Sequence, residues 1–205
     1  GSEMCIRDSI NPEDEIIIPD PGFVTYESQV YLAGGTPVHF PLRGENNFHP
    51  DLKELKNCIT PKTRAILLNS PSNPTGAAFN KEELLAIAGI AKEKNLFIIS
   101  DELYEDIVYD GREHISISSL PGMKEKTISI FGFSKSYAMT GWRLAYLAAP
   151  LNLVKEIAKL LQNTSVCANS IAQRAGLAAI QGSQYCVKEM FAAYNERRNE
   201  LTKGL

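Results

Sequence analysis

Up to about residue 150, short apolar runs alternate with longer amphipathic segments. The apolar runs include EIIIP at 15–19, PVHF at 37–40 and RAILLN at 64–69, and the amphipathic segments include DLKELKN at 51–57. Short apolar runs bounded by turn-forming residues are typical of strands, and the segments between them have a polar and an apolar side. The alternation indicates an α/β protein with a layered sheet.

The clearest helix pattern is KEELLAIAGIAKEK, which predicts a helix from about Lys81 to Lys94. Asn80 and Glu83 have the spacing of a capping box, in which two side chains satisfy backbone N–H groups at the start of a helix. Five apolar residues of the segment should face the core because they recur at helical spacing. They are Leu84, Leu85, Ile87, Ala88 and Ala91.

Three later runs are continuously apolar: LFIIS at 96–100, TISIF at 127–131 and LAYLA at 144–148. Strands that are covered on both faces of a largely parallel sheet have this character. We therefore expect all three to be buried strands.

From Leu151 onward the pattern changes to helices only. The candidate helices lie at about 151–162, 168–181 and 184–203, and no further strand is indicated. The sheet domain should therefore hand over to helices after about residue 150.

Composition narrows the class of protein. The chain has 205 residues, of which 44% are hydrophobic and 22% charged, as expected for a globular protein with one large core. A net charge of -3 without a basic run disfavours nucleic acid and anionic membranes as partners. The 4 cysteines form no CxxC pair and the 3 histidines are isolated, so neither a zinc site nor a disulfide framework is indicated. We expect a cytoplasmic protein that acts on small molecules.

The first ten residues, GSEMCIRDSI, differ in character from the sequence that follows. They carry charges and lack the apolar segment of a secretory signal, and no later run approaches a membrane span. We expect residues 1–9 to be a non-native leader or a native terminus of poor order. Residues 10–205 should form the domain.

Three polar clusters follow apolar runs that are predicted to be strands. NSPSNPTG at 69–76 follows RAILL, DELY at 101–104 follows LFIIS, and GFSK at 132–135 follows TISIF. Ligands of open α/β sheets bind at the carboxyl ends of the strands. Taken singly, Asn73 fits a turn residue better and Asp101 fits a helix cap better than a binding role. Together, an amide, a carboxylate with a phenol, and a lysine at one edge indicate a binding site.

The sequences SNPTG, SDELYED and GFSKSYAMTGWRLAY resemble the class I aminotransferases, which are fold-type I enzymes dependent on pyridoxal 5'-phosphate. The resemblance runs from about Ile10 to the C-terminus and is close to prokaryotic aspartate and aromatic aminotransferases. It implies a three-layer α/β/α large domain with a mainly parallel sheet. It also implies transamination between an amino acid and a 2-oxo acid, and a homodimer when the protein is of full length.

The resemblance gives Lys135 the central role. This lysine would hold the cofactor as a Schiff base and move the proton between the substrate and the cofactor. Arg143 would grip the cofactor phosphate with its guanidinium fork, and Ser134 would add a hydroxyl. Many relatives have a serine where this chain has Gly132, so that phosphate contact is missing or comes from the backbone.

The resemblance assigns the remaining cofactor contacts to four residues. Asp101 would pair with the pyridine nitrogen, and the protonated ring would then act as an electron sink. Tyr104 and Asn73 would both hydrogen-bond the cofactor 3'-oxygen, which makes Lys135, Asp101 and Tyr104 the implied catalytic residues. Phe23 matches the aromatic residue that stacks on the pyridine ring, and an ordinary core phenylalanine is the alternative.

Two other functions are compatible with these residues. A β-lyase would use the same lysine for elimination. A non-catalytic effector domain of a transcription regulator would keep the fold, but it would need a DNA-binding segment that this sequence does not show.

The resemblance begins downstream of the loop that supplies backbone donors to the phosphate. It ends before the domain whose arginine binds the substrate carboxylate, so the choice of amino acid is not predicted. We expect the 205-residue chain alone to bind pyridoxal phosphate weakly, to catalyse no transamination and to self-associate.

Overall fold

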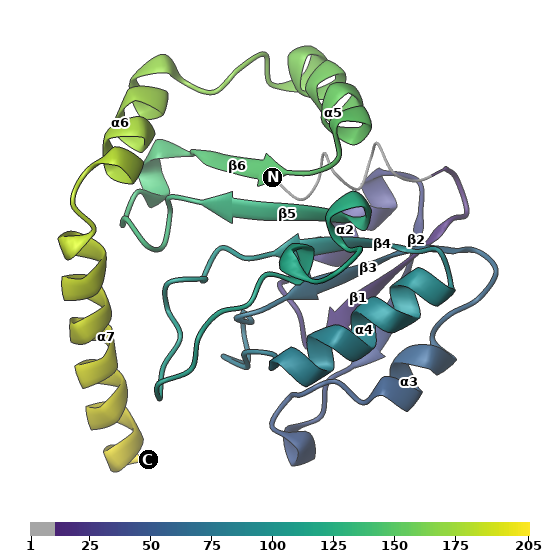
Figure 1. Ribbon diagram of the computed structural model, residues 1–205, viewed down its shortest axis with the longest axis horizontal. Coiled ribbons are helices and arrows are strands. Elements are labelled where there is room, and N and C mark those ends of the chain that lie inside the picture. Colours follow the sequence, from purple (N-terminus) through teal and green to yellow (C-terminus); the bar gives the residue numbers. More distant parts are fainter. Residues whose placement is uncertain (1–10) are drawn as a thin grey trace.

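A computed structural model describes residues 11–205 and has a six-stranded sheet at its centre (Figure 1). The strand order is β2-β1-β3-β4-β5-β6, in which β1 to β5 are parallel and β6 is antiparallel to β5. The strands are β1 (Glu15–Asp20), β2 (Thr36–Pro41), β3 (Thr63–Asn69), β4 (Phe97–Asp101), β5 (Thr127–Gly132) and β6 (Ala145–Ala148).

Helices cover both faces of the sheet. Helices α3 (Leu52–Asn57) and α4 (Lys81–Glu93) share one apolar core with the sheet, whereas α2 (Thr25–Leu32) and α5 (Leu151–Thr164) share the other. The three-layer α/β/α architecture with a mainly parallel sheet is therefore confirmed. The leader predicted for residues 1–9 lies outside the described residues.

Alternation along the strands explains the two cores. Ile66 and Leu68 of β3 belong to the core under α4, and Ala65 and Leu67 belong to the core under α2 and α5. Successive side chains of a strand point to opposite faces, so a strand covered on both sides needs apolar residues throughout. The run RAILLN has that composition.

Helix α4 begins at Lys81 as predicted, and the capping box of Asn80 and Glu83 is present. The prediction was wrong for Leu85, which is 46% exposed. Leu85 shares its side of the helix with residues 89 and 92, which lie four and seven positions later and face solvent. The other four predicted residues of the stripe are buried: Leu84, Ile87, Ala88 and Ala91.

The prediction of a buried strand was also wrong for LAYLA. Strand β6 lies at the edge of the sheet and pairs only with β5. Tyr146 is 47% exposed, and Ala145 and Ala148 are exposed as well. The continuously apolar run therefore reflects an edge strand with incomplete cover in the described part of the chain.

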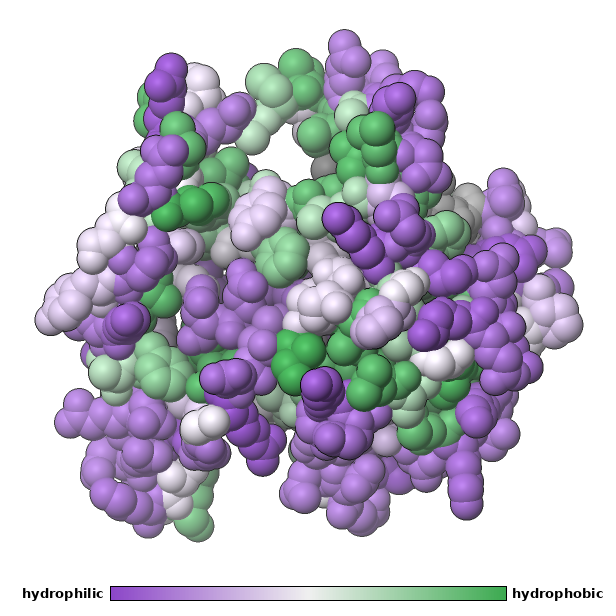
Figure 2. All heavy atoms as spheres, viewed as in Figure 1, coloured by the Kyte–Doolittle hydropathy of each residue, from purple (hydrophilic) through white to green (hydrophobic). Residues whose placement is uncertain are grey.

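After β6 the described chain contains only helices, as predicted: α5, α6 (Ser170–Gln181) and α7 (Tyr185–Gly204). Helix α6 packs against the turn that follows β5, where Ala172 joins Phe133 and Leu144 in a third apolar cluster. Helix α7 extends along one side of the molecule, with none of its residues buried (Figure 1). On the face of the molecule that Figure 1 views, hydrophilic side chains dominate, with apolar patches between them (Figure 2). Between residues 11 and 205 no helix is long and apolar enough to cross a bilayer.

Candidate active site

The three polar clusters meet at one edge of the sheet. They follow β3, β4 and β5, which are neighbours in the strand order. Asn69 at the end of β3 pairs with Asp101 at the end of β4, and Asp101 pairs in turn with Ile130. The carboxyl ends of the central strands therefore carry the candidate chemistry.

Asp101 is a buried acid with fixed hydrogen-bond partners. It is 6% exposed, its Oδ2 accepts the phenol proton of Tyr26 at 2.8 Å, and its Oδ1 accepts the backbone N–H of Leu103 at 3.3 Å. Burial raises the pKa of Asp101 above its ordinary value, whereas the two donors and the charge of Lys135 act to lower it. These donors stabilise the ionised carboxylate where burial disfavours it.

Tyr26 is a site residue that sequence reasoning missed. It is 2% exposed, and burial followed by the charge of Asp101 raises its pKa far above the ordinary range, so the phenol stays protonated and donates. It lies three residues after Phe23, whose ring meets the Tyr26 ring edge-on with centroids 5.7 Å apart. Phe23 is 40% exposed and lies two residues before the start of α2. The available signal was the helical spacing of Tyr26 and Val30, which lie on the buried side of α2.

Lys135 lies in the turn after β5, which Phe133 and Met139 anchor in the cluster with α6. Its Nζ lies 5.4 Å from the centre of the Tyr104 ring, a cation–π distance. Both side chains are half-buried. The structure thus brings Lys135, Tyr104 and Asp101 together.

Gly132 leaves room for the side chain of Leu103. A Cβ at Gly132 would overlap the side chain of Leu103, which belongs to the turn that carries Tyr104. The glycine therefore has a packing reason at the position where the resemblance led us to look for a phosphate contact.

Asn69 organises the loop that carries Asn73. It is 3% exposed, its Oδ1 accepts the backbone N–H of Asn73 at 2.8 Å, and its Nδ2 donates to the carbonyls of Pro71 and Asp101 at 3.3 and 3.2 Å. Sequence reasoning missed Asn69 because its role depends on contacts with the neighbouring strand. It holds Asn73, which is half-buried, beside the end of β4.

Hydrogen bonds through Thr140 link Arg143 to Ser134, and none of these bonds reaches Asp101. The Arg143 guanidinium donates to the Thr140 carbonyl at 3.2 Å, and the Thr140 hydroxyl donates to the Ser134 carbonyl at 3.0 Å. Arg143 is exposed, has the left-handed φ of 51°, and lines a hollow of about 380 Å³ beside β6 and α5. A left-handed backbone is uncommon for a residue other than glycine.

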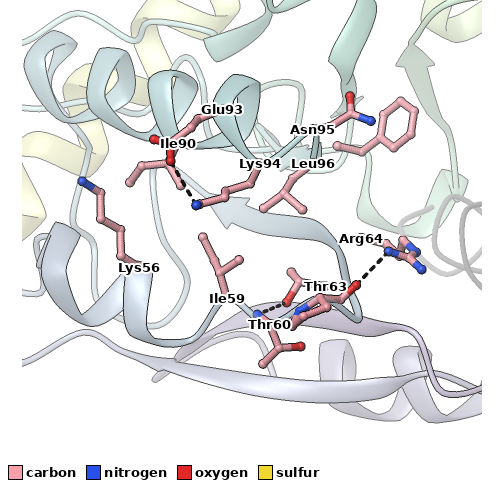
Figure 3. A pocket seen from close by; sticks show the side chains of 12 residues that line it. Lys56, Ile59, Thr60, Thr63, Arg64, Ile90, Glu93, Lys94, Asn95 and Leu96 are labelled. Atoms are coloured by element: carbon pink, nitrogen blue, oxygen red, sulfur yellow. Dashed lines mark hydrogen bonds and ion pairs between the residues drawn. The ribbon is translucent and has the colours of Figure 1, made fainter.

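A larger hollow of about 770 Å³ lies at the opposite end of the sheet, by the amino ends of β3 and β4 (Figure 3). Its cations are Lys56, Arg64 and Lys94, and Lys94 Nζ pairs with Glu93 at 3.0 Å. These are exposed charges over an apolar floor. Over residues 11–205, no group of three or more His, Cys, Asp and Glu is arranged to hold a metal ion. The chemistry is therefore gathered at the carboxyl ends.

Comparison with known sequences gives a consistent picture. The sequence model of the family described as aminotransferase class I and II matches residues 1–205. The aspartate aminotransferase of Musicola paradisiaca is 45% identical over 196 residues, which cover 96% of this chain and 49% of that protein. The aromatic-amino-acid aminotransferase 2 of Thermococcus litoralis is 45% identical over 204 residues, which cover 98% and 52%. The chain spans about half the length of the curated relatives it matches.

Solved structures agree with the sequences. The aromatic aminotransferase from Pyrococcus horikoshii superposes with a TM-score of 0.96 at 41% identity, covering 98% of this chain and 54% of that one. A double mutant of the aspartate aminotransferase of Thermus thermophilus superposes with a TM-score of 0.95 at 36% identity, covering 99% and 53%. The fold therefore has close counterparts among solved aminotransferase structures.

Proposed function

Because this chain belongs to the class I and II aminotransferase family, we propose that it forms the cofactor-binding part of an enzyme dependent on pyridoxal 5'-phosphate. The enzyme moves an amino group between an amino acid and a 2-oxo acid. The observation that carries the proposal is the meeting of a buried acid, Asp101, with Lys135 and Tyr104 at the carboxyl ends of neighbouring strands.

The donor set fits this cofactor. A protonated pyridine nitrogen needs a buried anion, an aldehyde needs an amine, and a phosphate needs a cation. Asp101 supplies the anion, Lys135 the amine and Arg143 the guanidinium. When bound, the cofactor would supply an electron sink for the charge left on the substrate carbon.

Asp101 would keep a proton on the ring nitrogen. Its buried carboxylate gains most from a cationic partner, because water does not screen the interaction. Tyr26 and the N–H of Leu103 hold the carboxylate in one orientation and favour its ionised form.

Lys135 would hold the cofactor and then move the substrate proton. Its side chain has a flexible four-carbon stem, so one amine can reach both the bond to the cofactor and the substrate α-carbon. Tyr104 lies beneath the amine and would donate to the cofactor 3'-oxygen together with Asn73. Phe23 would stack on the ring. Arg143 and Ser134 would hold the phosphate.

Covalent trapping tests the proposal. Because the chain spans about half the length of its relatives, the experiment uses the complete open reading frame that contains it. Incubation with pyridoxal phosphate and borohydride should label one peptide, the one with Lys135. Lys135→Ala should abolish the label, and Lys94→Ala, at the other end of the sheet, should keep it. Labelling that survives Lys135→Ala would refute the assignment.

Product analysis tests the reaction. Aspartate and an aromatic amino acid are the donors to try first, because the relatives are named for them. Transamination yields a 2-oxo acid and a new amino acid, whereas a β-lyase yields ammonia and pyruvate. Nothing in the comparisons favours a β-lyase or an effector domain. A cytoplasmic location and a homodimer remain predictions.

A further inference from the structure

A second buried carboxylate, Glu102, follows Asp101 directly, and the proposed function gives it no role. It is 1% exposed, and its Oε2 lies 2.6 Å from His114 Nε2. Its Oε1 accepts the hydroxyl of Ser116 at 2.9 Å, and its backbone N–H donates to the carbonyl of Ile130 at 2.9 Å. Both oxygens of this carboxylate are therefore engaged by residues at least twelve positions later.

These contacts close a loop. Residues 103–113, here called the 103–113 loop, follow the end of β4 and stop just before His114 and Ser116. A buried carboxylate that loses its partners is costly, so the contacts should persist whenever the chain is folded. One side chain thus fastens both ends of the loop to the sheet.

The loop connects the candidate site with α7. Tyr104, under Lys135, lies in its first turn. Farther along, the ring of Tyr109 stacks on that of Phe191 with centroids 5.4 Å apart, and Asp110 forms a bidentate ion pair with Arg198. Figure 1 shows the loop reaching from the strand ends toward α7.

We propose that Glu102 is a positioning residue, which acts through His114 and Ser116 to fix Tyr104 against Lys135. The inference rests on the proposed function, because Tyr104 matters only if a cofactor lies there. Tyr104 is two residues from Glu102 and far along the loop from α7, so the clasp at Glu102 governs it more directly than the contacts with α7 do. A residue with a purely structural role would affect the stability of the fold and leave the bound cofactor as it is.

The experiment compares two buried carboxylates in the complete open reading frame. The control is Asp14, which lies just before β1 at the other end of the sheet, is 7% exposed and has its Oδ1 3.0 Å from Arg64 Nε. In the cofactor-free protein, amide hydrogen exchange of the 103–113 loop should rise in Glu102→Ala. With pyridoxal phosphate added, the absorption maximum of the bound cofactor should shift and its Kd should rise ~10-fold, about 1.4 kcal/mol. Asp14→Ala should change neither measurement.

A graded series keeps the test decisive. Glu102→Gln retains part of the hydrogen bonding, so its changes in loop exchange and cofactor binding should be smaller than those of Glu102→Ala. Ser116→Ala should also give a smaller change than Glu102→Ala. If Glu102→Ala does not fold, these two variants decide the question. The proposal is overturned if they lower stability while loop exchange and the cofactor spectrum match the parent. If the parent itself does not attach cofactor to Lys135, the proposed function fails, and exchange in the cofactor-free protein still decides whether Glu102 fastens the loop.

Discussion

Two buried aspartates lie at opposite ends of the sheet and have different partners. Asp14, just before β1, is 7% exposed, and its Oδ1 lies 3.0 Å from Arg64 Nε. Asp101, at the end of β4, is 6% exposed and accepts hydrogen bonds from neutral donors, Tyr26 and the N–H of Leu103. Within residues 11–205, Asp101 forms no ion pair.

The difference separates an acid with an internal cation from one without. The cation beside Asp14 offsets the cost of burying its charge, as in an ordinary ion pair. Burial raises the pKa of Asp101, and no cation of the described chain lies in contact with it. A buried acid in this condition gains from an external cation, and perturbed acids of this kind gather at functional sites.

The size of a hollow does not identify the site. The hollow of about 770 Å³ at the amino ends is larger than the hollow of about 470 Å³ that Tyr104 lines, yet its charges are exposed and partly paired with one another. The carboxyl ends hold the buried acid and the lysine above a phenol. Burial of titratable groups is therefore the better guide here.

The largest expected effect comes from removing each aspartate charge in turn. Asp101→Asn should lower kcat on the order of 10²–10³-fold, because a charge that stabilises the transition state is lost. Asp14→Asn should leave kcat unchanged and lower stability by about 1.5–3 kcal/mol, because Arg64 loses a charged hydrogen-bond partner. Steady-state kinetics and urea unfolding of both variants test this contrast. Equal effects of the two variants on kcat would contradict a special role for the acid at the carboxyl ends of the strands.

Tyr26→Phe should act on Asp101 without changing the packing. Removal of the phenol donor costs about 1.5–3 kcal/mol of interaction with the charged acid. The pKa of Asp101 should rise further, so cofactor binding should be lost at a higher pH on the acidic side of its profile. The measurement is the Kd for pyridoxal phosphate against pH. Tyr31→Phe, at a residue of α2 that is 60% exposed, is the control and should match the parent.

Two glycines should respond in opposite directions. Gly132→Ala should destabilise the fold by about 1 kcal/mol, because its Cβ would overlap the terminal methyl of Leu103, which must shift. Gly89→Ala should stabilise it by about 0.5–1 kcal/mol, because Gly89 lies inside α4 and its Cβ would meet open space. Thermal unfolding measures both. Leu103→Ala added to Gly132→Ala should relieve the overlap, and no relief would show that another contact is responsible.

The smallest effect concerns Glu105 in the 103–113 loop. Burial, together with the charge of Asp106, raises the pKa of Glu105 from 4.5 to about 7. The folded protein therefore holds this proton to a higher pH than the unfolded chain, and the related stability is lost as the pH rises from about 4.5 to about 7. Glu105→Gln should thus unfold at a higher urea concentration than the parent at pH 8, and the difference should shrink at pH 5. A difference independent of pH would contradict the assignment.

Periodicity was enough to predict the layers of the fold. The helix from Lys81 and the strands before Asn69 and Asp101 follow from spacing alone, because covered strands and amphipathic helices leave a local pattern. Tyr146 and Leu85 contradicted the pattern. Their exposure depends on which elements cover the edge of the sheet and the side of the helix, and this cover is set by the assembled fold.

The meeting of the candidate residues was predictable as far as strand ends could be located. Asp101 and Lys135 follow apolar runs, so a parallel sheet brings them to one edge. The contacts that orient them were not predictable, because Tyr26 lies 75 residues before Asp101 and no local pattern links the two. The clasp of Glu102 with His114 was missed for the same reason.

A crystal structure of the complete gene product grown with pyridoxal phosphate tests the central claim most directly. We predict cofactor joined covalently to Lys135, with its ring nitrogen within hydrogen-bond distance of Asp101. The cofactor should lie at the carboxyl ends of β3, β4 and β5. Cofactor in the hollow among Lys56, Arg64 and Lys94, or at the carboxyl ends without a bond to Lys135, would contradict the account.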